Sequence, residues 1–294
     1  MNARNLVKDK SFIAVIMTVL LLILVFAVSR SSADGADLSP EKDDSYRNIP
    51  ILMYHSILPD TERQGDYVIS PSLLESDMVW LKEHGYTAVA AGQVIDFCLN
   101  GGELPEKPVI LTFDDGQLNN LTYVLPLLIK YDMCGVFSVV GRYTEAACEE
   151  AEPSDLYSYM DLHDIVTLTQ TGIAEIANHS YDLHGLGERR GSLQLGSESF
   201  EEYRRLFFND TFKVQEMIKE ATGITPQVYT YPFGLTCAAS RTLVKVCGFK
   251  ASLGAEEKIS RIIRGDGSSL YELGRFNRPA GISTEQFMNG ILSR

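Results

Sequence analysis

The stretch "VILTFDDG", Val109–Gly116, joins an apolar run to two acidic residues and a glycine. The run is rich in residues that favour β-structure, and it predicts a buried strand that ends at Phe113. Asp114 and Asp115 then follow at the carboxyl end of the strand, where parallel α/β folds keep their active sites. Two adjacent like charges cost free energy unless a cation or a shared proton compensates them. The stretch therefore indicates a metal site, although an Asp-Asp-Gly turn that caps the next helix remains an alternative.

Similar apolar runs recur along the chain and alternate with segments of helical period. The expected strands are Ile51–Tyr54, Thr87–Ala90, Val109–Phe113, Gly135–Val140, Ile173–Ala177, Gln227–Tyr231 and Phe249–Leu253. The expected helices are Ser72–His84, Leu118–Tyr131, Asp161–Thr171, Glu201–Thr222 and Ala238–Cys247. Alternation of this kind is typical of a parallel sheet, and we expect an α/β fold, a deformed (β/α) barrel of about seven parallel strands. Arg142–Tyr159 and Gly185–Ser199 are expected to be irregular loops at one end of it.

The N-terminal segment predicts export from the cytoplasm. Three basic residues precede an uncharged apolar run, Phe12–Val28, and a polar stretch follows it. The run is slightly shorter than the roughly 20 residues that span a bilayer comfortably, yet longer than most signal-peptide cores. We expect residues 1–29 to be a membrane anchor, 30–46 a linker and 47–294 the functional domain. The protein would then be a single-pass membrane protein with its domain outside the cell, or a secreted one if the segment is cleaved.

Charge and cysteine content exclude some functions. The 39 acidic and 26 basic residues give a formal net charge of -13, which argues against a nucleic-acid partner. The five cysteines are widely spaced and odd in number, so they predict neither a zinc ribbon nor a disulfide framework.

A second polar motif, "EIANHSYDLHG" at Glu175–Gly185, carries His179 and His184. It also follows an apolar run, so both histidines are expected near the carboxyl end of a strand. Two neutral imidazoles and one carboxylate form the usual ligand set of an open, catalytic metal site. Zinc suits these ligands, and cobalt, nickel or iron fit the same set.

Two weaker signals lie at the ends of other expected strands. In "VYTYPFG", Val228–Gly234, proline and glycine predict a sharp turn whose amide groups are available to a developing oxyanion. In "NIPILMYHS", the run Ile51–Tyr54 ends at His55. A histidine at a strand end is often only hydrogen-bonded to a neighbouring loop, and from this segment alone that interpretation stands beside a catalytic one.

Together, Thr112–Gly116, His179 with His184, and Tyr231–Gly234 resemble motifs of the polysaccharide deacetylases, the carbohydrate esterase family 4 that shares a NodB homology domain. The resemblance covers roughly residues 47–294. It implies that Asp114 is the general base, that Asp115, His179 and His184 bind the metal, and that the backbone amide of Phe233 helps to hold the oxyanion.

The sequence departs from the common family pattern in three ways. The two histidines stand five residues apart, as in the branch that deacetylates poly-N-acetylglucosamine, whereas four is common. The usual arginine of the third motif is missing, and no histidine follows His184. In the poly-N-acetylglucosamine branch an N-terminal histidine supplies the acid, which implies His55. Arg275 and Arg278 are compatible with orienting a carboxylate, touching sugar or fixing a loop, and they stay unassigned.

The resemblance implies a metal-dependent hydrolase that removes N-acetyl groups from a bacterial surface polysaccharide. Its partners would be that N-acetylated polysaccharide and, through the N-terminal helix, the membrane. Poly-N-acetylglucosamine is the expected substrate and peptidoglycan the main alternative. A surface glycan-binding protein without turnover is the alternative from another functional class.

Overall fold

The structure is a computed structural model that describes residues 44–59 and 61–292. The predicted anchor over residues 1–29 and most of the predicted linker lie outside these ranges. Within them, no helix combines the length and the apolar character that crossing a bilayer requires.

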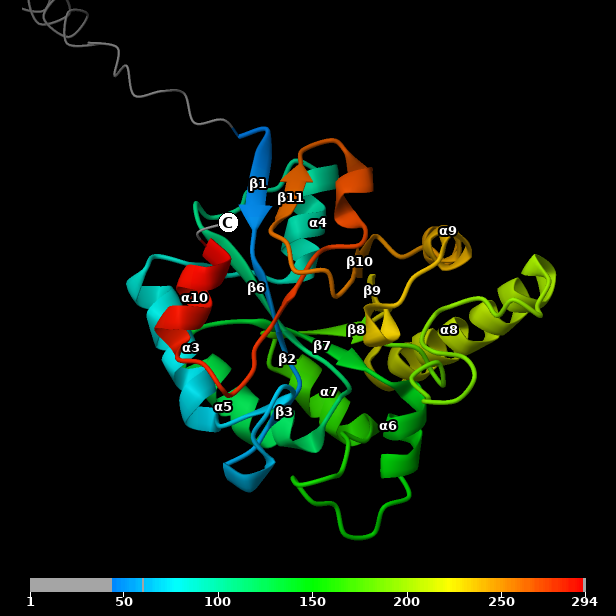
Figure 1. Cartoon of the computed structure of the whole chain (residues 1–294), viewed down its shortest axis with the longest axis horizontal. Helices are drawn as coiled ribbons and strands as arrows, with labels where there is room; N and C mark the ends of the chain where they lie inside the picture. Colours follow the sequence, from blue (N-terminus) through cyan, green and yellow to red (C-terminus); the bar gives the residue numbers. More distant parts are fainter. Residues whose placement is uncertain (1–43, 60, 293–294) are drawn as a thin grey trace, which may run out of the picture. The chain divides into compact units, whose positions relative to one another are not determined.

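A parallel sheet forms the centre of the domain (Figure 1). The seven expected parallel strands are confirmed, among them the short β5 (Thr87–Ala88), which pairs with the start of β6, and β12 is an eighth strand that the sequence pattern did not predict. The strands follow one another in the order β12 (Phe276–Asn277), β2 (Ile51–Tyr54), β6 (Pro108–Phe113), β7 (Gly135–Val139), β8 (Ala174–Asn178), β9 (Val228–Thr230) and β10 (Ala251–Leu253).

The segment from Leu273 to Asn277 connects the two ends of this sheet. Leu273 forms a parallel bridge with Leu253 of β10, and β12, a few residues later, pairs with β2. The sheet therefore curls round as the predicted deformed barrel does, and one late segment of the chain closes it.

Side chains of the central strands alternate between two hydrophobic clusters, because successive strand residues point to opposite faces. Leu111 and Phe113 of β6 pack in the cluster beneath α3, α5, α7 and α10, whereas Ile110 packs in the cluster that includes α4. Both faces of the sheet are thus buried, as is usual for parallel strands. Asp114 comes four residues after Ile110, so the alternation places it on the same face of the sheet as Ile110.

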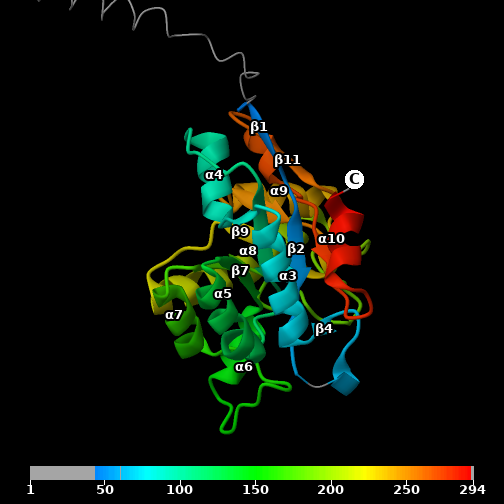
Figure 2. The same ribbon diagram turned by 90° about the vertical axis from the view of Figure 1, so that its left-hand side faces the viewer.

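Most of the helices pack on one face of the sheet, whereas α4 packs against the cluster on the other face (Figure 2). Their ends carry the expected signals. Ser70 caps α3 by accepting from the Leu73 amide at 3.1 Å, and Gly223 ends α8 in the left-handed conformation. The helices are α3 (Pro71–Glu83), α4 (Ala91–Leu99), α5 (Leu125–Tyr131), α6 (Gly141–Ala147), α7 (Leu162–Gln170), α8 (Phe200–Thr222), α9 (Ala238–Val246) and α10 (Thr284–Leu292). A π-helical turn, η2 (Asn120–Val124), precedes α5.

Short strands and 3₁₀ turns lie at both ends of the barrel. β1 (Tyr46–Ile49) and β11 (Ser260–Ile263) pair antiparallel; they lie with α4 at the end where the strands begin (Figure 1). β3 (Ser56–Ile57) and β4 (Val68–Ile69) pair beyond the carboxyl end of β2. The 3₁₀ turns are η1 (Thr61–Arg63), η3 (Pro232–Gly234) and η4 (Gly267–Leu270).

The expectation that Arg142–Tyr159 is irregular is wrong for its first part, because α6 extends to Ala147. This helix has only two turns and no capping side chain at Val140, so the usual start signals are absent from the sequence. The second expected loop, Gly185–Ser199, contains neither helix nor strand.

Candidate active site

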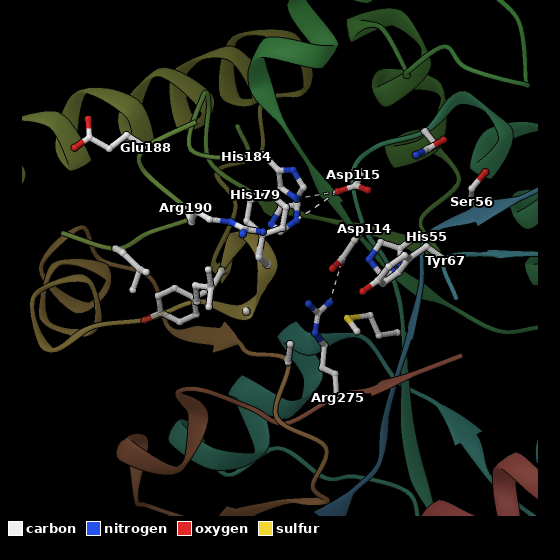
Figure 3. A pocket seen from close by; sticks show the side chains of 18 of the residues that line it. His55, Ser56, Tyr67, Asp114, Asp115, His179, His184, Glu188, Arg190 and Arg275 are labelled. Carbon is white, nitrogen blue, oxygen red and sulfur yellow. Dashed lines mark hydrogen bonds and ion pairs between the residues drawn. The ribbon is translucent and has the colours of Figure 1, made fainter. Parts of the chain in front are cut away.

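The carboxyl ends of adjacent parallel strands bring the predicted site residues together. His55 follows β2 and Asp114 follows β6, and these strands are in register at Tyr54 and Phe113. His179 follows β8, whose last residue Asn178 lies beside Val139 of β7. Asp115, His184 and Phe233 join them around one cavity of about 850 Å³ (Figure 3).

Three of these residues form a possible metal centre. Ligand atoms of Asp115, His179 and His184 all lie within 4.8 Å of one another. Asp115 Oδ1 is 3.6 Å from His179 Nε2 and 3.2 Å from His184 Nε2. The same oxygen is buried and has no hydrogen-bond partner among the described residues. A buried carboxylate oxygen facing two imidazole nitrogens fits a divalent cation.

Burial keeps both histidines in the neutral form that metal ligation needs. It lowers the pKa of His179 to about 3, and it lowers the pKa of His184 as well. His179 Nδ1 lies 2.8 Å from the Thr230 carbonyl. Because a carbonyl only accepts, Nδ1 must donate, and the lone pair is left on Nε2, which faces Asp115. Metal-bound histidines are commonly fixed in this way.

The backbone is left-handed at each of the three motif turns. Asp115 has φ 73°, Ser180 φ 69° and Phe233 φ 57°, a conformation that non-glycine residues rarely adopt. Such strain tends to gather at functional sites. At Gly116, φ is also 73°, and a Cβ atom would lie 3.2 Å from Val139 Cγ1. The turn that presents both aspartates therefore requires glycine at this position.

Asp114 forms a buried ion pair with Arg275, which lies on the side of Asp114 away from His179 and His184 (Figure 3). Arg275 Nη1 lies 2.8 Å from Asp114 Oδ1, and Nε donates to the Gly254 carbonyl at 2.7 Å. Burial raises the pKa of Asp114, but the charge of Arg275 and its hydrogen bond outweigh this and hold the pKa well below its usual value. Asp114 is therefore ionised and cannot be a proton donor.

The sequence assigned no role to Arg275 or Arg278, and in the structure the two arginines pair with different carboxylates. Arg275 precedes β12 and reaches the site, whereas Arg278 pairs with Asp77 of α3 away from the cavity lining. The only sequence signal for Arg275 is that a charged residue stands in the apolar segment Leu273–Phe276. This signal does not identify the carboxylate with which Arg275 pairs.

His55 lies across the cavity from the two ligand histidines (Figure 3). Its Nδ1 is buried without a hydrogen-bond partner in the described structure, so Nδ1 makes no bond to a neighbouring loop of the kind that a purely structural role predicts. Its ring meets that of Tyr67 edge-on, with the centroids 4.9 Å apart. Tyr67 is 59% exposed and lines the same cavity.

Phe233 lies in the turn η3 and places its ring 4.3 Å from that of His184. The neighbouring Gly234 has no room for a side chain, because a Cβ atom would lie 2.3 Å from that of Ala255. The turn therefore packs closely against Ala255 on one side and, through Phe233, against His184 on the other. The role of the Phe233 amide as an oxyanion donor stays a prediction.

Comparison with known proteins decides the family. The model of the family described as polysaccharide deacetylase matches residues 101–252, just over half of the chain. The chain belongs to the polysaccharide deacetylase family. Deacetylases of this family are hydrolases and are generally metal-dependent, which agrees with the possible metal centre of Asp115, His179 and His184.

Curated relatives carry the name poly-beta-1,6-N-acetyl-D-glucosamine N-deacetylase. The one from Escherichia coli K12 is 22% identical, over 89% of this chain and 44% of the relative. The one from Staphylococcus aureus MSSA476 is 24% identical, over 85% of this chain and 88% of the relative. The chain thus spans less than half of the Escherichia coli deacetylase and most of the staphylococcal one.

Solved structures of deacetylases share the fold. A de-N-acetylase from Aggregatibacter actinomycetemcomitans is 25% identical with a TM-score of 0.68, covering 83% of this chain and 100% of that one. IcaB from Ammonifex degensii is 22% identical with a TM-score of 0.66, covering 83% of this chain and 96% of that one.

Proposed function

We propose that this polysaccharide deacetylase is a metal-dependent N-deacetylase of N-acetylglucosamine units in a bacterial surface polysaccharide, with poly-N-acetylglucosamine as its substrate. The observation that carries the proposal is the convergence in one cavity of an ionised Asp114, the triad of Asp115, His179 and His184, and His55. The names of the relatives from Escherichia coli and Staphylococcus aureus support this choice of glycan.

Asp115, His179 and His184 would hold the divalent cation. One carboxylate and two imidazoles suit Zn²⁺, and Co²⁺, Ni²⁺ or Fe²⁺ are compatible with the same ligands. When bound, the cation would polarise the acetamide carbonyl and make water more acidic.

The protein's own groups would handle the protons. Asp114 accepts a proton from the attacking water, whose oxygen forms the new bond to the acetamide carbon. The amide of Phe233 donates to the oxygen that gains negative charge. His55, protonated, donates to the nitrogen as the C–N bond breaks. Acetate and a free amine on the sugar are the products.

The first test measures acetate release by the purified protein loaded with Zn²⁺ or Co²⁺. Oligomers of poly-N-acetylglucosamine and peptidoglycan are offered in parallel. We expect release from the oligomers, and a decrease of about 10²–10⁴-fold in His55→Ala, because that variant lacks the proposed acid. Release of acetate from peptidoglycan alone would show that peptidoglycan, and not poly-N-acetylglucosamine, is the substrate. No release from either glycan by folded, metal-loaded protein would favour the binding-protein alternative.

Replacing Arg275 with methionine should shift the pH dependence of the reaction. Asp114 works as a base only when ionised, so activity is lost as the pH falls through its pKa. Without the arginine charge, burial raises that pKa, and the acid limb of kcat/KM should move to higher pH. The loss should be larger in weakly acidic than in alkaline buffer. Arg261→Met, at an exposed arginine stacked on Tyr46, is the matched control. An acid limb that stays in place would argue against Asp114 as the base.

We also propose that the domain lies outside the cell, tethered by residues 1–29. The basic residues and the apolar run at the N-terminus support this placement. Digestion of the domain by protease added to intact cells would test it, and full protection would contradict it.

A further inference from the structure

The amides of the loop between His179 and His184 are bound by side chains. All four of its internal amides donate to side-chain oxygens. Ser180 N donates to Asn178 Oδ1 at 2.9 Å, Tyr181 N to Asp210 Oδ1 at 2.9 Å, Asp182 N to Asp210 Oδ2 at 2.7 Å, and Leu183 N to Ser180 Oγ at 3.2 Å. No ladder of the sheet fixes these amides, so on the amide side the loop depends on the side chains that accept from them. On the carbonyl side, Ser180 and Tyr181 accept from the amides of Gly141 and Arg142 at 3.0 Å.

Asp210 differs from the other acceptors in its origin. Asn178 is the last residue of β8 and Ser180 lies in the loop, whereas Asp210 lies on α8, 28 residues after Asp182. Both of its oxygens are used, one on each of two consecutive amides. The next residue of the helix, Thr211, accepts from Asn178 Nδ2 at 3.0 Å through its carbonyl. One turn of α8 therefore holds the loop through Asp210 and the end of β8 through Thr211.

The two histidines depend on this loop to different degrees. His179 is held without the loop. Its amide donates to the Val139 carbonyl at 3.0 Å, and its ring nitrogen Nδ1 donates to the Thr230 carbonyl. His184 comes at the far end of the loop, and its backbone carbonyl accepts only a long hydrogen bond, 3.3 Å, from Tyr143. A shift of the loop would thus move His184 relative to His179 and Asp115.

We propose that Asp210 is a positioning residue of the metal centre, which holds His184 in place by binding the amides of Tyr181 and Asp182. Four residues lie between the two histidines, and the Asp210 carboxylate holds the middle two, Tyr181 and Asp182, by their amides. The proposal rests on the metal centre of the proposed function, but it concerns metal affinity and requires no turnover.

The test compares metal affinity in Asp210→Asn, Asp210→Ala and the unmodified full chain. Zn²⁺ dissociation constants come from competition with a chelator, and Co²⁺ absorption reports the coordination geometry. Asp210→Asn keeps the size of the side chain but turns a donor toward one of the two amides. Loss of such an outer partner typically weakens metal binding by about 10–100-fold. We expect that decrease, with a changed Co²⁺ spectrum, in both variants.

Asp182→Asn is the matched control. It removes the same charge from the same loop, but its carboxylate is 48% exposed and pairs with Arg142 at the surface, and its backbone amide remains. We expect its Zn²⁺ affinity to stay within about fivefold of the unmodified protein.

Three results would overturn the proposal. They are unchanged Zn²⁺ affinity in folded Asp210→Asn, an equal loss in Asp182→Asn, or metal-free Asp210 variants that are both unfolded by circular dichroism, which would make the contact one of general stability. Absence of Zn²⁺ binding by the unmodified protein would instead contradict the metal centre itself.

Discussion

Asp114→Asn should lower kcat/KM for acetate release by about 10²–10⁴-fold, the usual contribution of general acid–base catalysis, while metal binding is retained. Asparagine keeps the size of the side chain and can still accept from Arg275, so the cavity floor should keep its packing. It cannot take a proton from water. Steady-state release of acetate from N-acetylglucosamine oligomers, measured beside Zn²⁺ affinity, checks both parts of the expectation.

His179→Ala provides the contrast. It removes a buried ligand, so metal binding and activity should be lost together. Asp114→Asn should lose activity alone. If Asp114→Asn retained more than a tenth of the unmodified activity, the base would have to be another group. If it lost the metal as His179→Ala does, Asp114 would be a ligand.

The second large effect concerns stability. Asp77 and Arg278 form a fully buried ion pair, with Arg278 Nε 2.8 Å from Asp77 Oδ2. Thr284 and Tyr54 also donate to this carboxylate, and the Arg278 amide donates to the Met53 carbonyl at 3.0 Å. The pair thus joins α3 to the closing segment and to β2. Removing one partner leaves an uncompensated buried charge, and Asp77→Ala should lower the free energy of unfolding by about 3–5 kcal/mol.

Urea unfolding measured by circular dichroism checks this value. The matched variant replaces both partners with apolar residues, Asp77→Leu with Arg278→Met. Because it leaves no unpaired charge, it should recover much of the lost stability. A single variant as stable as the unmodified protein would show that the pair contributes little. A double variant less stable than the single one would show that the charges themselves are required.

The sequence predicted those parts of the fold that depend on local pattern. Ile51–Tyr54 has the bounds expected for it, because an uninterrupted apolar run followed by a polar residue marks a buried strand. His55, Asp114 and His179 could be placed in one cavity because the carboxyl ends of parallel strands share one edge of the sheet. The helices α4, α6 and α10 were missed. In α4 and α6 the N-cap residues, Ala90 and Val140, provide no capping side chain, so the usual start signal is absent from the sequence.

Contacts between distant segments were beyond the sequence. Asp210 lies in a long amphipathic helix, where an acidic residue is normally a solvated surface group, and its partners are 28 and 29 residues away. Arg275 meets Asp114 across 161 residues. His55 and Arg275 also lie outside residues 101–252, the segment that matches the family, so that segment alone would appear to lack both of them.

The closing segment sets the order in which the cavity becomes complete during protein synthesis. A ribosome delivers His55 first, then Asp114 and Asp115, the two ligand histidines and Phe233, and only later Arg275. A nascent chain that stops before Leu273 would contain every motif residue. Its Asp114 would lack the positive charge of Arg275, and its sheet would lack the strand beside β2. The cavity therefore becomes complete only after synthesis has passed Asn277, the last residue of β12.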